Sequence, residues 1–249
     1  MKLRHLFAFA GVWLLVFYLI PVAVSAAIWF SDTKPLSYRD ADWSSSGQIG
    51  ADIGEGAEIR VYGARAGRYK GILAVHTWLL VKPEGQRTFD RYEVVGWGNP
   101  VRVNAYAPDA RWYSNEPELI QRVTGERARR AVPKLVAAIE NYPFRHRGTY
   151  RVWPGPNSNT FVSHVLAAVP DLKAQLPPTA IGKDFPVDGR MIGRTAGGYR
   201  LSAGGLVSVL AGRAGFEVNL FGLVAGFDVL RPALKLPGIG RIGLPATAA

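Results

Sequence analysis

The chain contains no cysteine and only four histidines among its 249 residues. Without cysteine it cannot form a disulfide, a thiolate nucleophile or a cysteine-ligated metal site. His5, His76, His146 and His164 are scattered, with no H-E-x-x-H motif or comparable ligand spacing. The composition therefore predicts no metal ion and no other cofactor.

Charge is absent from one long stretch near the N-terminus, Leu6 to Phe30. At about 1.5 Å per residue, a helix over this stretch exceeds the roughly 30 Å hydrocarbon layer of a bilayer. Lys2 and Arg4 precede the stretch and Asp32 follows it, and positive charge favours a cytoplasmic flank. We therefore expect a transmembrane helix that leaves the rest of the chain outside the cytoplasm.

A cleaved signal peptide is the alternative interpretation of the same stretch. Val24-Ser25-Ala26 offers the small residues that a signal peptidase requires, although the apolar run is longer than a usual signal-peptide core. Both interpretations deliver the remaining chain to the same compartment.

The composition beyond this stretch is that of one globular domain, since 48% of the chain is hydrophobic and 20% is charged. We predict a cytoplasmic N-terminus over 1–5, a transmembrane helix or signal anchor over 6–30, a linker over 31–56 and an extracytoplasmic α+β domain over 57–249. The linker is rich in Ser, Gly, Asp and Pro, and it shows no periodicity.

The net charge of +11 comes from 30 basic against 19 acidic residues. For a protein translocated across a membrane, anionic lipid or cell-wall polymer is a more accessible partner than nucleic acid. The expected partners are therefore the lipid bilayer and, as candidates, cell-wall peptide, glycan or anionic lipid, with no nucleic acid. A solvated basic surface without a partner is an equal alternative.

The first half of the domain has strand patterns. Residues 58–62 alternate between polar and apolar, 72–81 form a long apolar stretch around His76, and 89–97 return with β-branched and aromatic residues. Together they predict antiparallel strands joined by hairpins.

Helical signals follow these strands. Ser114 or Asn115 is positioned to cap a short helix beginning near Glu116, and Thr124 is positioned to cap a second one. Pro133 is expected to kink the second helix or to mark a restart. The predicted buried stripe of this helix consists of Ala128, Ala131, Val132, Leu135 and Ile139.

The last third of the chain mixes both signals. Residues 148–153 predict a short strand, and Asn157 or Ser158 is positioned to cap a helix after a Pro-Gly-Pro turn. Residues 201–229 predict further strands, and 232–245 an extended arm. The fold class predicted is thus α+β, an antiparallel sheet with packed helices.

Chemistry is most plausible at the start of the helix after Pro156. The orphan N–H groups and the positive end of a helix dipole favour an anion or a developing oxyanion. The alternative is that Asn157 or Ser158 only caps the helix and has no chemical role. The residues expected to bind a ligand here are Trp153, Asn157, Asn159 and Thr160.

Two resemblances bear on this segment. A strand-borne histidine, a second strand and an Asn-Ser-x-x-Phe-Val helix start resemble the circularly permuted papain-like superfamily, which includes NlpC-type peptidases and has Asn-Cys-x-x-Phe-Val there. Residues 153–161 and 232–241 also resemble a bacterial family, the domain of unknown function 3750. These resemblances imply a permuted papain-like domain on the bacterial inner membrane.

The papain-like resemblance places His76 as the imidazole base and Ser158 at the nucleophile position, with Glu93 as a candidate orienting group. Serine in place of cysteine departs from the superfamily, because a serine must lose its proton during attack. His76 as a hydrogen-bonded core residue is an open alternative. Two functions therefore remain open, a binding or scaffold module that keeps the cleft, and a Ser/His hydrolase or acyltransferase of envelope amides or esters.

Overall fold

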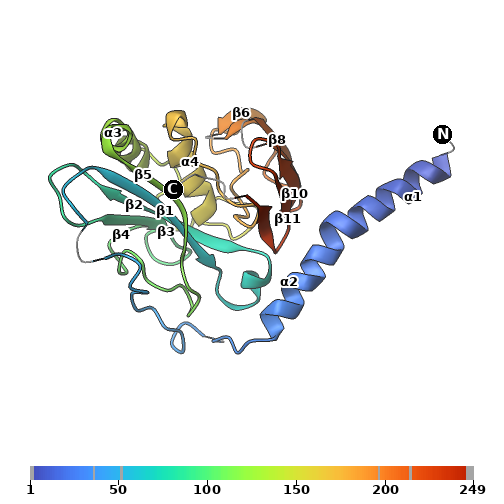
Figure 1. Cartoon of the computed structure of the whole chain (residues 1–249), viewed down its shortest axis with the longest axis horizontal. Coiled ribbons are helices and arrows are strands. Elements are labelled where there is room, and N and C mark those ends of the chain that lie inside the picture. Colours follow the sequence, from blue (N-terminus) through green and yellow to red (C-terminus); the bar gives the residue numbers. More distant parts are fainter. Residues whose placement is uncertain (1–2, 36, 51–52, 196, 213–214, 245–249) are drawn as a thin grey trace.

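The computed structural model describes residues 3–35, 37–50, 53–195, 197–212 and 215–244. It begins with one long helical rod, in which α1 (Leu3–Leu14), a π-helical turn (Leu15–Leu19) and α2 (Ile20–Phe30) follow without interruption. The rod projects away from the rest of the molecule (Figure 1). By length and composition, Arg4–Phe30 is able to cross a membrane, and no other helix in the described part of the chain meets that test.

The first sheet has five antiparallel strands in the order β4-β3-β2-β1-β5. Each strand is hydrogen-bonded antiparallel to its neighbours, and β1 pairs with both β2 and β5. Its strands are β1 (Glu58–Arg65), β2 (Val75–Lys82), β3 (Asp90–Val94), β4 (Val101–Val103) and β5 (Glu118–Thr124).

Both faces of this first sheet are covered. Helices α3 (Gly125–Glu140) and α4 (Ser158–Ala167) pack on one face, where Leu79 and Val81 of β2 join the main hydrophobic core. Loops pack on the other face, around Trp78 and Leu80. Coverage on both sides explains why the central strands β1 and β2 are buried along nearly their whole length.

Helix α3 confirms the predicted buried stripe, since all five of its residues are buried. Pro133 lies inside a helix that continues from Gly125 to Glu140, so of the two outcomes expected for it, a kink or a restart, the restart is wrong. The proline is exposed on the side of the helix that faces away from the core.

The short helix expected near Glu116 is wrong, because strand β5 occupies 118–124. Asn115 does not cap a helix. Its side-chain amide instead donates to the carbonyl oxygens of Arg65, Trp112 and Tyr113. The residues that follow form β5, because their pairing with β1 outweighs the local preference for a helix.

The short strand expected over 148–153 is also wrong. The segment is irregular, and the Arg151 N–H bonds the carbonyl of Pro156 within the same loop. The segment therefore has no neighbouring strand to pair with.

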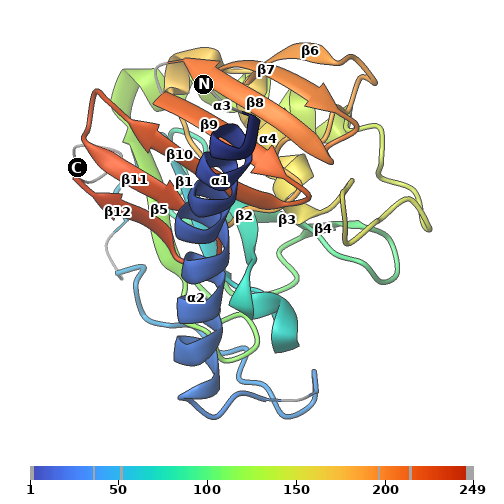
Figure 2. The ribbon, with the colours of Figure 1, turned by 90° about the vertical axis from the view of Figure 1, so that its right-hand side faces the viewer.

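The second sheet is a seven-stranded antiparallel meander in sequence order, seen face-on in Figure 2. Its strands are β6 (Ile192–Thr195), β7 (Gly198–Ala203), β8 (Val207–Gly212), β9 (Gly215–Leu220), β10 (Leu223–Asp228), β11 (Ala233–Leu236) and β12 (Gly240–Gly243). The extended arm expected over 232–245 is wrong where the structure describes it, since it supplies β11 and β12. The fold is therefore α+β but mostly β, with two antiparallel sheets where the sequence predicted one.

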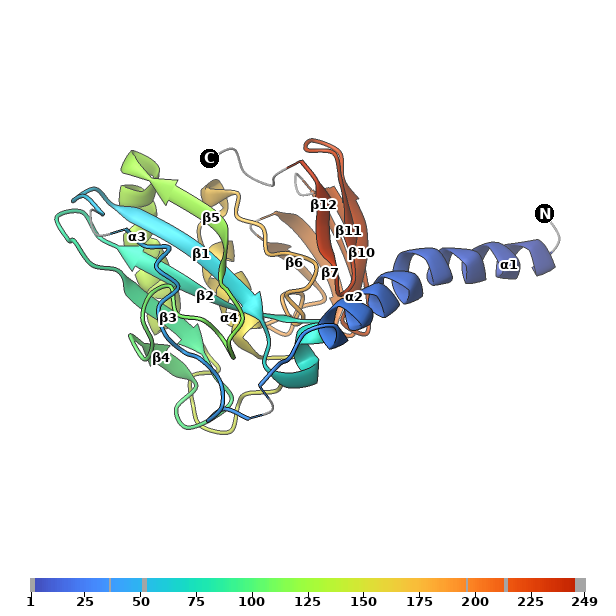
Figure 3. The same cartoon turned by 60° about the horizontal axis from the view of Figure 1, so that its bottom comes forward.

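The two sheets form separate layers with α4 between them (Figure 3). Helix α4 contacts β2 and β3 of the first sheet and β6 of the second. The stretch expected as a linker lies along the domain, where Trp43 packs against Tyr106 and Trp112 and the Ser45 hydroxyl donates to Asp109.

Truncating Leu135 tests the main core. The residue is fully buried in α3, so we expect Leu135→Ala to lower the free energy of unfolding by about 2–5 kcal/mol through lost burial and a residual cavity. Leu119→Ala is the matched control, because Leu119 of β5 is 45% exposed and its loss should stay within about 0.5 kcal/mol. Urea unfolding of the detergent-solubilised chain measures both, and equal losses would contradict this core assignment.

Candidate functional site

A cavity of about 320 Å³ opens where strand β2 begins and helix α4 begins. His76 and Ser158 both line it. Its walls combine aromatic, aliphatic and small residues with the polar side chains of Asn157 and Asn159 and the basic side chain of Lys70. The aromatic lining consists of Trp97, Trp112, Tyr113, Tyr150 and Trp153.

Asn157 fixes the first residues of α4. Its side-chain oxygen accepts from the N–H groups of Asn159 at 3.0 Å and Thr160 at 3.1 Å, while its own N–H donates to the Thr160 hydroxyl. Gly182 permits this arrangement, because a Cβ there would lie 2.3 Å from the Asn157 amide nitrogen. The helix therefore starts at Ser158, whose N–H has no hydrogen-bond acceptor in the described part of the chain.

His76 belongs to a buried polar triad on the loop-covered face of the first sheet. Its Nε2 lies 2.8 Å from Glu93 Oε2, and Arg91 Nη2 donates to that same oxygen at 3.0 Å. Both Arg91 and Glu93 are fully enclosed, and His76 is 5% exposed. A buried charge without a countercharge is unfavourable, and the opposite charges of Glu93 and Arg91 compensate each other.

The triad fixes the protonation of the histidine. Burial alone would raise the pKa of Glu93, but His76 and Arg91 outweigh it and hold that pKa below its usual range. Burial lowers the pKa of His76, an effect that Glu93 only partly offsets. At neutral pH a neutral His76 thus donates its Nε2 proton to the Glu93 carboxylate, and Nδ1 carries the lone pair.

The second ring nitrogen of His76 makes no hydrogen bond within the described part of the chain. Nδ1 has no hydrogen-bond partner among the described residues and still retains accessible surface, as does the Ser158 hydroxyl. The other side of the ring is held by Trp112, which stacks on it at a centroid distance of 3.6 Å. The imidazole is thus fixed in position and tautomer, with one lone pair open to a ligand.

Ser158 and His76 reach this cavity from opposite faces of strand β2. Helix α4 packs on the side of Leu79, while His76 lies on the side of Trp78. Within the described residues, no hydrogen bond joins the Ser158 hydroxyl to the His76 ring. The structure therefore brings the two residues to one cavity without a direct bond.

The other residues expected to bind a ligand differ in their surroundings. Asn159 accepts from the Thr77 hydroxyl and donates to the carbonyls of Val75 and Ile181, so its side chain ties α4 to β2. Thr160 is buried and donates to Gly182. Trp153 is 46% exposed at the cavity wall, with no hydrogen bond inside the described part of the chain.

Sequence reasoning missed Arg91 and Trp112. Arg91 precedes Glu93 by two residues and so shares its strand face, a signal that a fixed strand register would have provided. Trp112 lies in a loop 36 residues after His76, and nothing local in the sequence indicates that they stack.

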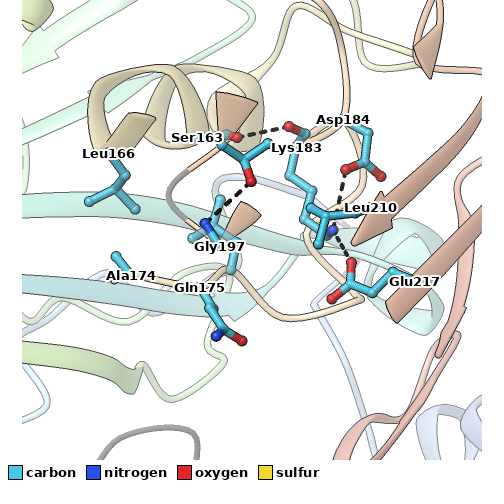
Figure 4. A pocket seen from close by; sticks show the side chains of 11 residues that line it. Ser163, Leu166, Ala174, Gln175, Lys183, Asp184, Gly197, Leu210 and Glu217 are labelled. Carbon is cyan, nitrogen blue, oxygen red and sulfur yellow. Dashed lines mark hydrogen bonds and ion pairs between the residues drawn. The ribbon is translucent and has the colours of Figure 1, made fainter. Parts of the chain in front are cut away.

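A second polar cluster lies between α4 and the second sheet (Figure 4). Lys183 bonds the carboxylates of Asp184 and Glu217, and Lys235 bonds Glu217 at 2.6 Å, all four being nearly enclosed. Burial would raise the pKa of Glu217, but the two lysines hold it below its usual range. The adjoining cavity of about 30 Å³ has room for roughly one water molecule, so this cluster joins the layers rather than holding a ligand.

Metal ligands are not gathered in the described part of the chain, where no three His, Asp or Glu side chains are positioned to share an ion. The cavity beside His76 instead combines a neutral base, a serine hydroxyl and aromatic walls. This cavity lies in an α+β domain that carries an N-terminal apolar helix.

The family model described as protein of unknown function (DUF3750) matches residues 56–185. This match covers more than half of the chain, which therefore belongs to that family. It spans the first sheet, both domain helices and every residue of the cavity lining. No curated protein and no solved structure matches the chain.

Replacing Glu93 by glutamine tests the triad. Glu93 raises the pKa of His76 by its hydrogen bond and its charge, and Arg91 would lose its countercharge, so we expect Glu93→Gln to lower the His76 pKa further. NMR titration of the imidazole C–H resonances in micelles measures this shift, with the other three histidines as internal controls. An unchanged or raised His76 midpoint would contradict the assigned geometry.

Proposed function

We propose that this protein is a membrane-anchored binding module whose cavity takes a small, largely apolar ligand with one hydrogen-bonding group. The observation that carries this proposal is a cavity lined by aromatic and aliphatic residues that also presents two side-chain atoms without a hydrogen-bond partner among the described residues, His76 Nδ1 and the Ser158 hydroxyl. Apolar walls with few polar groups are typical of ligand sites of this size.

The polar atoms specify the complementary chemistry. His76 Nδ1 accepts a hydrogen bond, while the Ser158 hydroxyl and N–H offer donors at the positive end of α4. An acyl or aryl group joined to an amide, ester or carboxyl group satisfies both. Acylated lipids and peptides of the cell envelope belong to this class, in line with an N-terminal helix that could anchor the protein in the inner membrane.

Binding is tested with N-benzoylglycine, which carries an aryl ring, an amide and a carboxylate. Saturation-transfer NMR on the full chain should detect it, and Trp153→Ala should weaken binding by about threefold to tenfold through loss of an aromatic wall. Val103→Ala is the control, because Val103 is 53% exposed on β4 and lies outside the cavity lining. Equal binding by both variants would mean that the ligand sits elsewhere.

A second function, a hydrolase or acyltransferase, is favoured by the orientation of His76. In that reaction Ser158 Oγ attacks the substrate carbonyl carbon as its proton passes to His76 Nδ1, and the N–H groups at the start of α4 face the oxyanion. Collapse expels the amine or alcohol with the proton from His76, leaving an ester on Ser158. Water or a second acceptor then releases the acyl group and returns the proton to Ser158.

Fluorophosphonate labelling separates the two functions. An activated Ser158 should label in the full chain, lose all labelling in Ser158→Ala, and label at least about 100-fold more slowly in His76→Ala because the base is gone. Ser163→Ala is the control, since Ser163 lies in the same helix but donates to the Lys183 carbonyl. Absence of labelling in the unmodified chain would rule out the enzyme and leave the binding module.

A further inference from the structure

The second sheet is inverted relative to an ordinary half-buried sheet. The strand register puts Tyr199, Ala211, Phe216, Phe227 and Leu234 in one cross-strand row on the outer face. A neighbouring row on that face contains Leu201, Val209, Val218 and Ala225. The side chains of the first row are open, with Phe227 and Leu234 each 47% exposed and Tyr199 59% exposed.

The inner face of the same strands is polar. It bears the buried charges Arg200, Glu217, Asp228 and Lys235, together with Ser202, Ser208 and Asn219. These residues alternate with the exposed apolar ones, so the sheet directs its charges inward and its aromatic and aliphatic side chains outward. Among the described residues of the outer rows, Arg194 is the one charged member, at the end strand β6.

The N-terminal helix contacts this outer face from the π-helical turn onward, while α1 projects away from it (Figure 1). Its buried residues are Tyr18, Pro21, Ser25 and Trp29, which form one stripe at helical spacing. The Tyr18 hydroxyl donates to the Val218 carbonyl at 3.0 Å, and the Ser25 hydroxyl donates to the carbonyls of Ile72 and Gly238. Every other side of the helix is open and apolar.

The length of the helix and these contacts together constrain how deep the second sheet lies in a bilayer that the helix crosses. Residues 4–17, before the first contact, extend about 21 Å, which is too short for a hydrocarbon layer of roughly 30 Å. A helix that crosses the bilayer must therefore keep Tyr18 and the following turns in lipid. Because Tyr18 touches β9, the adjoining outer face of the sheet lies at the same depth.

We propose that the outer face of the second sheet is a membrane-embedded surface that enters the hydrocarbon of the adjacent leaflet beside the helix. A water-exposed apolar area spread over seven strands would be unusual in a soluble monomer. Interfacial residues gather where the helix ends, since Trp29, Lys34, Arg68 and Tyr69 line one pocket there, together with Asp32, the ion-pair partner of Lys34. Aromatic and basic side chains at that position suit the lipid headgroup level.

The absence of cysteine makes a direct test possible. Single variants Phe227→Cys and Leu234→Cys are labelled with the fluorophore NBD in the full chain, which is then reconstituted into phosphatidylcholine–phosphatidylglycerol vesicles. Val103→Cys and Leu119→Cys are matched controls, since Val103 and Leu119 are equally exposed apolar residues of the first sheet. We expect lipid-borne doxyl groups to quench the two sheet labels at least about threefold more than the controls, and aqueous iodide to quench only the controls.

Two outcomes would overturn the proposal. Iodide quenching of the sheet labels equal to that of the controls would place the outer face in water. Labels shielded from both quenchers would indicate a protein cover, and cross-linking between Leu234→Cys chains would then identify that cover as a second copy. Neither outcome bears on ligand binding beside His76, so this proposal and the proposed function fail independently.

Discussion

The side chain of Asn159 holds the site together. It accepts from Thr77 and donates to Val75 on β2, and its second donor bond reaches Ile181. One amide thus joins the start of α4, the strand that carries His76 and the loop that supports the helix cap. Because the amide is buried, a lost bond would leave polar groups unsatisfied at a cost of about 1–3 kcal/mol each, so the cavity keeps its shape only while this junction is intact.

The sequence predicted the strands and helices that have strong local patterns. The stripe of α3 and a helix cap at Asn157 or Ser158 follow from spacing and residue type, and the structure confirms the stripe and shows that Asn157 is the cap. Strand β5 could not be predicted because its pairing with β1 joins segments about 60 residues apart, and local capping signals at Asn115 indicated a helix instead.

The site was predictable in part, because some of its residues also lie on elements with strong local patterns. His76, Glu93 and Ser158 lie on elements with clear patterns, and the structure brings all three to one region. Their relation could not be predicted, because it depends on which face of β2 each residue approaches. The alternation of Glu217 and Asn219 with apolar neighbours likewise marked a strand, but it could not tell which face of that strand would be covered.

The contacts of Tyr18, Ser25 and Trp29 also limit how far the domain, and with it the cavity, can move relative to the N-terminal helix. If residues 31–56 were a flexible linker, their root-mean-square end-to-end distance would be about 28 Å, and the domain could move over that distance relative to the helix. Here the end of the helix packs on the short 3₁₀ helix at Arg68–Ile72, which contributes Lys70 to the cavity lining. Under the proposed membrane anchoring, the cavity entrance is held at one height above the bilayer, where it would meet molecules that diffuse along the membrane plane rather than through the surrounding volume.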